Sequence, residues 1–180
     1  MIPQAIARQI AESFPALPDR MRRVGRYILD HPGIVAGRNV LDIGSGGGIV
    51  SIAAVFAGGA QVTALDIDPL AATACQMNAR LNGTADRITT ETADAIGYDL
   101  APFDLILVGD VCYARGQSDD LARRLRHTTV PVLFGDPGRQ FLPRQEIRWI
   151  ATYPVETCRE LEAESTVEGS VWRMIGTPPP

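Results

Sequence analysis

Residues 41–50 read LDIGSGGGIV, in which four glycines within five positions follow an acid, Asp42. The segment that leads into them, RNVLDIG at 38–44, is a short apolar run of the kind that forms a buried strand and enters a turn. The segment after them, GGIVSIAAVFAGG at 47–59, has the small apolar residues of a helix that packs on a sheet. A glycine-rich turn between such a strand and helix is typical of a nucleotide site in an α/β fold.

Strands and helices alternate along the rest of the chain. Apolar runs bounded by turn residues predict four further strands, at 60–68, 86–94, 103–110 and 130–139. Asp68 before a proline predicts the start of a helix over 69–83, and a second helix is predicted over 118–127. This order of elements predicts a mainly parallel, Rossmann-like sheet with helices on both faces.

The two ends of the chain extend this core. Helices are predicted at 2–14 and 19–32, and a helix-like segment at 143–150 precedes a closing pair of strands at 151–162 and 165–176. A length of 180 residues suits one domain. We therefore expect a single domain, with an N-terminal helical segment at 1–32, a core at 33–176 and a loose tail at 177–180.

Charge and cysteine content argue against several classes of protein. Seventeen basic and 21 acidic residues give a net charge of −4, without the basic excess of a nucleic-acid-binding protein. Cys75, Cys112 and Cys158 are widely spaced, and His31 and His127 are the two histidines, so neither a disulfide framework nor a metal site is predicted. The composition favours a protein of the reducing cytoplasm with no nucleic-acid partner.

The sequence also gives no signal for a membrane. No stretch reaches the roughly 20 apolar residues that span a bilayer. The first residues include polar and acidic side chains where a signal peptide is continuously apolar, although they could form an amphipathic helix. We expect a soluble, intracellular monomer without a membrane partner.

The spacing of the glycines argues against a dinucleotide. The G-x-G-x-x-G fingerprint needs a small third residue, but counting from Gly44 gives Gly46 and then Ile49. The Asp42 carboxylate would also repel a pyrophosphate at the helix N-terminus. S-adenosylmethionine has no phosphate and carries a cationic sulfonium and ammonium, so it suits this loop better. The alternative is a glycine turn that serves only strand–helix packing.

The glycine loop provides candidate contacts for the methionine part of this donor. Gly44, Gly46 and Gly48 would let the backbone approach it, and Ser45 belongs to the same predicted set. Asp42 would favour its positive charge directly or through water.

Acids that end the next strands provide candidates for the nucleoside part. Asp66, followed by Ile67, is placed to accept hydrogen bonds from the ribose hydroxyls. Asp68 competes for this role, but a helix cap explains it better. Asp94 would reach the adenine amino group unless it is an ordinary loop acid, and Asp110 completes the predicted donor-binding set.

The fourth and fifth strands end in VGDVCY and FGDPGR, at the same sheet edge as the glycine loop. Methyl transfer mainly needs alignment and desolvation of the nucleophile, without a metal. If the acceptor is lysine, Asp110 beside Tyr113 would hold the cationic amine and then accept hydrogen bonds from it as it loses its proton. We expect Asp110 and Tyr113 to be catalytic, and Asp136 and Arg139 to bind substrate.

Each of these residues also has a structural interpretation. Asp110 could cap a helix or form a salt bridge, and Tyr113 could be a packing residue. GDPGR suits an ordinary β-turn, which would leave Arg139 either in solvent or available to an acidic patch on a protein substrate. Cys112 is better explained as a small apolar residue than as a nucleophile, because nothing nearby would lower its pKa.

Together the motifs resemble those of the class I, seven-stranded S-adenosylmethionine-dependent methyltransferases. DVCY is similar to the Asp/Glu-x-x-Tyr/Phe motif of protein lysine methyltransferases. RYILDHPGIVAGRNVLDIGSGGG, ALDIDPLA, LILVGDVCY, LFGDPGR and VWRM resemble the electron transfer flavoprotein beta subunit lysine methyltransferases, over residues 26–175.

This resemblance implies a sheet whose last strand is antiparallel. It also implies a methyl donor at Asp42, Gly44, Gly46 and Asp66. Asp110 and Tyr113 would then lie near a substrate lysine of a partner protein such as electron transfer flavoprotein beta subunit.

One segment departs from the family pattern. Relatives carry a tryptophan-containing segment similar to PPFWAFAWPGG before the RYILDHP helix, where this chain has ESFPALPDRMRR at 12–23. Because the family segment lines the donor pocket, the departure implies another aromatic in its place, a different packing of the leading helix, or reduced activity. The alternatives are therefore a small-molecule N- or O-methyltransferase and a donor-binding homologue that has lost transfer.

Overall fold

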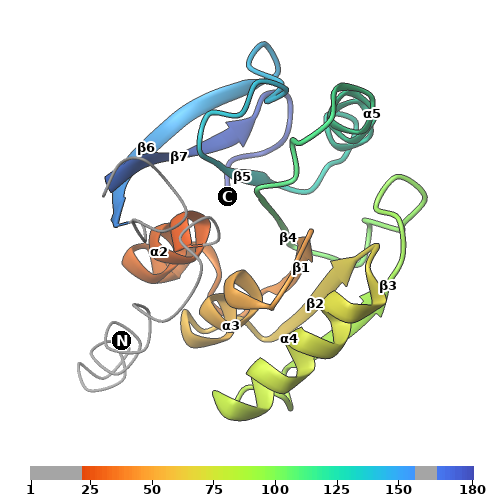
Figure 1. The fold of residues 1–180 in the computed structure, drawn as a ribbon, viewed down its shortest axis with the longest axis vertical. Coiled ribbons are helices and arrows are strands. Elements are labelled where there is room, and N and C mark those ends of the chain that lie inside the picture. The colour runs from red at the N-terminus through yellow and green to blue at the C-terminus, as the bar shows by residue number, and fades with distance from the viewer. Residues whose placement is uncertain (1–21, 157–165) are drawn as a thin grey trace.

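The computed structural model describes residues 22–156 and 166–180. Its strands form one seven-stranded sheet in the order β3-β2-β1-β4-β5-β7-β6 (Figure 1). They are β1 (Asn39–Ile43), β2 (Gln61–Asp66), β3 (Ile88–Thr92), β4 (Leu105–Gly109), β5 (Val132–Asp136), β6 (Ile147–Glu156) and β7 (Thr166–Met174). The helices are α2 (Arg22–Asp30), the 3-10 helix η3 (Pro32–Ile34), α3 (Ile49–Phe56), α4 (Pro69–Leu81) and α5 (Arg115–Leu125).

The sheet is parallel except for β7. This last strand lies between β5 and β6 and runs antiparallel to both, with Gly135 opposite Val171 on one side and Trp149 opposite Trp172 on the other. The predicted mainly parallel sheet with an antiparallel last strand is confirmed.

The central strands are mostly apolar because both faces of the sheet are covered. β4 and β5 are buried at every position. Alternate side chains separate into two cores: Val40 and Leu105 pack on the face with α2, α3 and α4, and Leu41 and Ile106 pack on the face with α5. Figure 1 shows α5 apart from the other helices, so the prediction of helices on both faces is confirmed.

The helix-like interpretation of residues 143–150 is wrong. A turn there closes with the Glu146 N–H donating to the Pro143 carbonyl, and β6 begins at Ile147. The β-branched and aromatic side chains at Ile147, Trp149 and Ile150 favour a strand, and pairing with β7 provides the hydrogen bonds.

Other boundaries differ less. α5 begins at Arg115, ahead of the predicted 118. Thr177 is buried and donates to the Met174 carbonyl, so the first residue of the predicted loose tail packs against the domain. The predicted helix at 2–14, most of the ESFPALPDRMRR segment and residues 157–165 lie outside the described residues. Within 22–156 and 166–180, no helix has the length and apolarity to cross a membrane.

Candidate functional site

A pocket lies where the strand order reverses. From the adjacent strands β1 and β4 the chain order runs outward in opposite directions, and open α/β sheets bind ligands at the carboxyl ends of such strands. The pocket has a volume of about 610 Å³, within the range of small-molecule sites. It is lined by Ile43, Gly44, Gly46, Gly47, Leu65, Asp66, Ile67, Ala93, Asp94, Ala95, Ile96, Gly109, Asp110, Val111, Tyr113, Gln117 and Leu121.

The glycine loop is shaped by two close approaches. Gly44, with φ +71°, faces Val111, and Gly48, with φ +81°, faces Cys75 of α4, so that a Cβ at either position would overlap its neighbour. Gly44 and Gly46 line the pocket, as predicted. Gly48 does not line it, because its role is to let the start of α3 approach α4.

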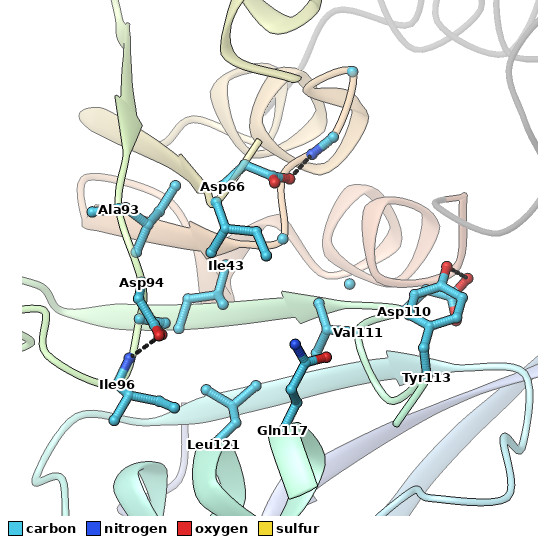
Figure 2. Close-up of a pocket in the computed structure, with 17 residues that line it drawn as sticks. Ile43, Asp66, Ala93, Asp94, Ile96, Asp110, Val111, Tyr113, Gln117 and Leu121 are labelled. Atoms are coloured by element: carbon cyan, nitrogen blue, oxygen red, sulfur yellow. Dashed lines mark hydrogen bonds between the residues drawn. The ribbon is translucent and has the colours of Figure 1, made fainter. Parts of the chain in front are cut away.

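Asp66 connects the second strand to this loop. Its Oδ2 accepts the Gly46 N–H at 2.9 Å and its Oδ1 accepts the Asp68 N–H at 3.0 Å, so the carboxylate is fixed at the pocket wall (Figure 2). Asp68 does not line the pocket, and its own Oδ1 accepts the Leu70 N–H at 2.9 Å at the start of α4. The interpretation of Asp68 as a helix cap is confirmed.

The far end of the pocket is less polar. Asp94 lies on the wall, and its Oδ1 accepts the Ile96 N–H at 2.9 Å (Figure 2). Ile96 and Leu121 add apolar surface, and Gln117 reaches the pocket from α5. Our sequence reasoning missed these last three residues. The predicted helix began at 118, so Gln117 fell outside it. Ile96 and Leu121 are single apolar residues, and nothing in the sequence indicates that the fold brings them together at a pocket.

Asp42 precedes the glycine loop and Ser45 lies within it, but neither lines the pocket. Asp42 is completely buried, and its Oδ2 accepts the Ser51 hydroxyl at 2.6 Å. Burial raises the pKa of this carboxyl to about 7, although the hydrogen bonds from Ser51 act in the opposite direction. The Asp42 side chain is bonded to Ser51 of α3, and its predicted action on the donor, directly or through water, stays a prediction.

Asp110 lies directly after β4 in an uncommon backbone conformation. Its φ is +49°, which only glycine adopts freely, and its N–H donates to the Gly135 carbonyl at 2.9 Å. Its side chain lines the pocket and accepts the Tyr113 hydroxyl at 3.1 Å. Figure 2 shows this pair at the end of the pocket opposite Asp94 and Ile96.

Tyr113 and Cys112 have different surroundings on the same loop. The Tyr113 side chain is 56% exposed, so this end of the pocket opens to the surface. Cys112 is buried, and burial raises the pKa of its thiol to about 12. A thiol with this pKa stays protonated at neutral pH, which agrees with the prediction that Cys112 fills space.

The turn after β5 holds Asp136 and Arg139 in contacts within the protein. Asp136 is buried, and its Oδ1 accepts the Gly138 N–H at 2.7 Å and the Arg139 N–H at 2.6 Å. The Arg139 guanidinium forms two hydrogen bonds to the Asp110 carboxylate and stacks 4.0 Å from the Tyr113 ring centroid. Neither Asp136 nor Arg139 lines the pocket, and both are engaged within the protein. That they bind substrate stays a prediction.

Comparisons with known proteins agree with the fold and the motifs. The sequence profile of the ribosomal protein L11 methyltransferase (PrmA) family matches residues 28–109. The electron transfer flavoprotein beta subunit lysine methyltransferase of Danio rerio is 38% identical over 158 residues, which cover 83% of this chain and 61% of that protein. The mouse protein of the same name is 35% identical, with the same coverage. The chain thus spans about three fifths of the length of these relatives.

A solved structure shares the fold. An RNA methyltransferase from Salinibacter ruber in complex with S-adenosyl-L-homocysteine has a TM-score of 0.58 and 20% identity, covering 84% of this chain and 88% of that one. The resemblance predicted from the motifs is confirmed: this chain has the fold of the class I S-adenosylmethionine-dependent methyltransferases and is similar in sequence to the electron transfer flavoprotein beta subunit lysine methyltransferases.

Proposed function

We propose that this chain uses S-adenosylmethionine to methylate a lysine of a partner protein, with electron transfer flavoprotein beta subunit as the first candidate. The observation that carries this proposal is the arrangement of the pocket. A partly buried carboxylate, Asp66, lies in one wall, while Asp110 and the half-exposed Tyr113 form a lip at the surface. A lip open to solvent suits a side chain presented by a macromolecule better than a small molecule that must be enclosed.

The residues of the pocket fit the donor. Asp66 retains acceptor capacity for the ribose hydroxyls beyond the two N–H groups that it already binds. Ile96 and Leu121 offer an apolar slot for adenine, with Asp94 beside it. Gly44 and Gly46 bring the backbone close to the methionine part. Asp42 does not line the pocket, so any effect of this acid on the methionine part would be transmitted through the glycine loop.

At the lip, the acceptor amine must approach as a neutral nucleophile. Bound S-adenosylmethionine supplies a methyl carbon on a cationic sulfur; the amine lone pair forms the N–C bond while the C–S electron pair returns to sulfur. Asp110 accepts an N–H of the amine and orients its lone pair, and Tyr113 shields it from water. The proton lost by the amine passes to solvent.

The composition of the chain simplifies the test. All 17 of its basic side chains are arginine, so every methyl-lysine in a reaction mixture belongs to the partner. The purified chain is incubated with methyl-labelled S-adenosylmethionine and purified electron transfer flavoprotein, and the beta subunit is then analysed by peptide mass spectrometry. We expect label on a lysine of the beta subunit, and none when the donor is replaced by S-adenosylhomocysteine.

Two other outcomes would contradict the proposal. Label that enters only the small-molecule fraction of a cell extract would indicate a small-molecule N- or O-methyltransferase. Binding of S-adenosylhomocysteine in a calorimeter without transfer to any acceptor would indicate a donor-binding homologue.

Compartment and assembly belong to the same proposal. We predict a cytoplasmic location, because the cysteines are few and widely spaced, and Cys75 and Cys112 are free and buried. We also predict a monomer. Sedimentation of the purified chain tests the monomer, and fractionation of cells tests the compartment.

A further inference from the structure

The Asp110–Arg139 pair joins the ends of two neighbouring strands at the lip. The Arg139 Nη2 donates to the Asp110 Oδ2 at 2.9 Å, and the Arg139 Nε donates to Oδ1. The Asp110 side chain is 3% exposed and that of Arg139 is 23% exposed, so solvent screens the pair only weakly. Such a two-pronged contact fixes both the position and the rotation of the carboxylate.

The chain holds Arg139 in place from several sides. The Asp136 carboxylate accepts the N–H groups of Gly138 and Arg139 and so fixes the turn from which the arginine extends. The Tyr113 ring lies under the guanidinium, with 4.0 Å to the ring centroid. The Asp110 N–H bonds to Gly135, which fixes the carboxylate side of the pair in the same way.

A count of acceptor sites shows what this geometry leaves free. A carboxylate has about four lone-pair directions. Two are taken by Arg139 and one by the Tyr113 hydroxyl, so about one remains for an N–H at the pocket. Asp110 can therefore orient one N–H of an acceptor amine without losing Arg139.

The charge of the pair favours one form of that amine. A single carboxylate would stabilise an ammonium and oppose the loss of its proton. Arg139 cancels this effect, because its guanidinium is permanently charged and Asp110 raises its pKa further. A net-neutral pair with one free acceptor site suits a neutral amine better than an ammonium.

The other titratable groups around Asp110 do not change this balance. Burial raises the pKa of Tyr113 and, to about 12, that of Cys112, so both are neutral at physiological pH. Asp136 is buried behind the turn, and burial raises its pKa. Asp66 and Asp94 line the donor part of the pocket.

We propose that Arg139 is a positioning residue that holds the Asp110 carboxylate and cancels its charge, so that the acceptor lysine reacts as a neutral amine. This inference rests on the proposed function and deepens it. It replaces the expectation that Arg139 binds an acidic patch of the substrate.

The test is the pH dependence of kcat, which reports the ionisation of the bound amine. For Arg139→Gln we expect the low-pH limb of the kcat–pH profile to shift to higher pH by about one pH unit. The reason is that the Asp110 carboxylate, no longer balanced by Arg139, stabilises the ammonium form of the acceptor. Arg139→Lys keeps the charge but loses the two-pronged contact, so its limb should stay near that of the wild type while kcat falls. Methylation is measured on the separated partner protein, because this variant introduces a lysine.

The matched control is Arg144→Gln. Arg144 is exposed and donates to the Gly138 carbonyl in the same turn, so its removal should leave the limb unmoved. An unmoved limb in Arg139→Gln, or equal losses of kcat in both Arg139 variants without a shift, would overturn the proposal.

A second measurement does not depend on transfer. With ¹³C-labelled tyrosine, NMR follows the ionisation of Tyr113, which is assigned by comparison with Tyr113→Phe. Because the guanidinium lowers the Tyr113 pKa, Arg139→Gln should raise it, and Arg139→Lys should raise it less. If the wild type transfers no methyl group, the proposed function fails, and this titration still decides whether Arg139 compensates Asp110. An unchanged Tyr113 pKa in Arg139→Gln would overturn the pairing.

Discussion

The ends of β1 and β4 lie side by side, and each places a carboxylate out of solvent, but the two acids are stabilised in opposite ways. Asp42 is completely buried, with the Ser51 hydroxyl on Oδ2 and no hydrogen-bond partner for Oδ1 among the described residues. Asp110 is almost as buried, but Arg139 and Tyr113 bind it. An acid without a counter-charge retains its proton more readily, whereas the charge of an acid paired with a guanidinium is balanced by its partner.

The comparison separates two roles within one sheet edge. Asp42 is bonded to Ser51 of α3 and does not line the pocket. Asp110 is fixed by charged and polar neighbours and presents a free acceptor direction to the pocket. Nearness to the strand end therefore does not decide which acid lines the pocket, and the two carboxylates differ in their partners.

Removal of the Asp110 charge should have the largest effect. Asp110→Asn leaves Arg139 without its counter-charge, and asparagine tolerates the positive φ, so the backbone is retained. We expect methyl transfer to the partner lysine to fall by about 10²- to 10³-fold, while affinity for S-adenosylhomocysteine changes far less. Asp104→Asn, at the opposite, exposed end of β4, is the matched control. Equal losses in the two variants would contradict a special role for Asp110.

The Asp42 prediction concerns stability and pH. The carboxyl titrates near 3.8 in the unfolded chain and at about 7 in the folded protein. Between these values the folded state holds a proton that the unfolded state has lost, so stability falls as the pH rises and levels off above about 7. Asp42→Asn cannot ionise, so it should retain the stability of about 4 kcal/mol that the wild type loses between about pH 4 and pH 8.

Urea unfolding at a series of pH values measures this difference. Asp86→Asn, an exposed acid in the turn before β3, is the control and should follow the wild type at every pH. If the curves for Asp42→Asn and the wild type are parallel, Asp42 is ionised in the folded protein, and the contrast with Asp110 is lost.

The sequence was sufficient for the framework because the framework depends on local signals. Short apolar runs bounded by turn residues predicted the strands of the core, and the Asp68–Pro69 pair predicted the cap of α4. The helix-like interpretation of 143–150 failed because pairing with a distant strand, β7, decided the conformation. Local pattern contains no information about such a partner.

The candidate site was predictable to a similar extent. Gly44, Gly46, Asp66, Ile67, Asp94, Asp110 and Tyr113 line the pocket as the motifs indicated. The orientation of Asp42 toward α3 and the pairing of Arg139 with Asp110 were not predictable. Both depend on contacts between segments whose distance in space the sequence does not give. Whether these residues bind the donor and acceptor stays a prediction.

A substitution of Asp66 tests whether this wall of the pocket binds the ribose of the donor. Asp66→Ala removes the acceptor of the Gly46 N–H as well as the proposed ribose contacts. Loss of charge-assisted hydrogen bonds should weaken binding of S-adenosylhomocysteine by about 30-fold, or about 2 kcal/mol. Isothermal calorimetry measures the affinity. Unchanged binding would mean that the ribose lies elsewhere.

Asp68 provides the smallest effect and the strictest comparison, because it lies two residues from Asp66 and bears the same carboxylate. Asp68→Ala removes the side-chain cap on the Leu70 N–H but keeps the main-chain N–H that bonds to Asp66. We therefore expect a loss of about 1 kcal/mol in the free energy of unfolding with no change in S-adenosylhomocysteine affinity. Asp68→Ser, which keeps a capping oxygen, should recover most of that stability. If Asp68→Ala instead weakens the affinity as much as Asp66→Ala does, the assignment of Asp66 as the ribose acceptor is wrong, and both acids act on the pocket through the geometry of their shared turn.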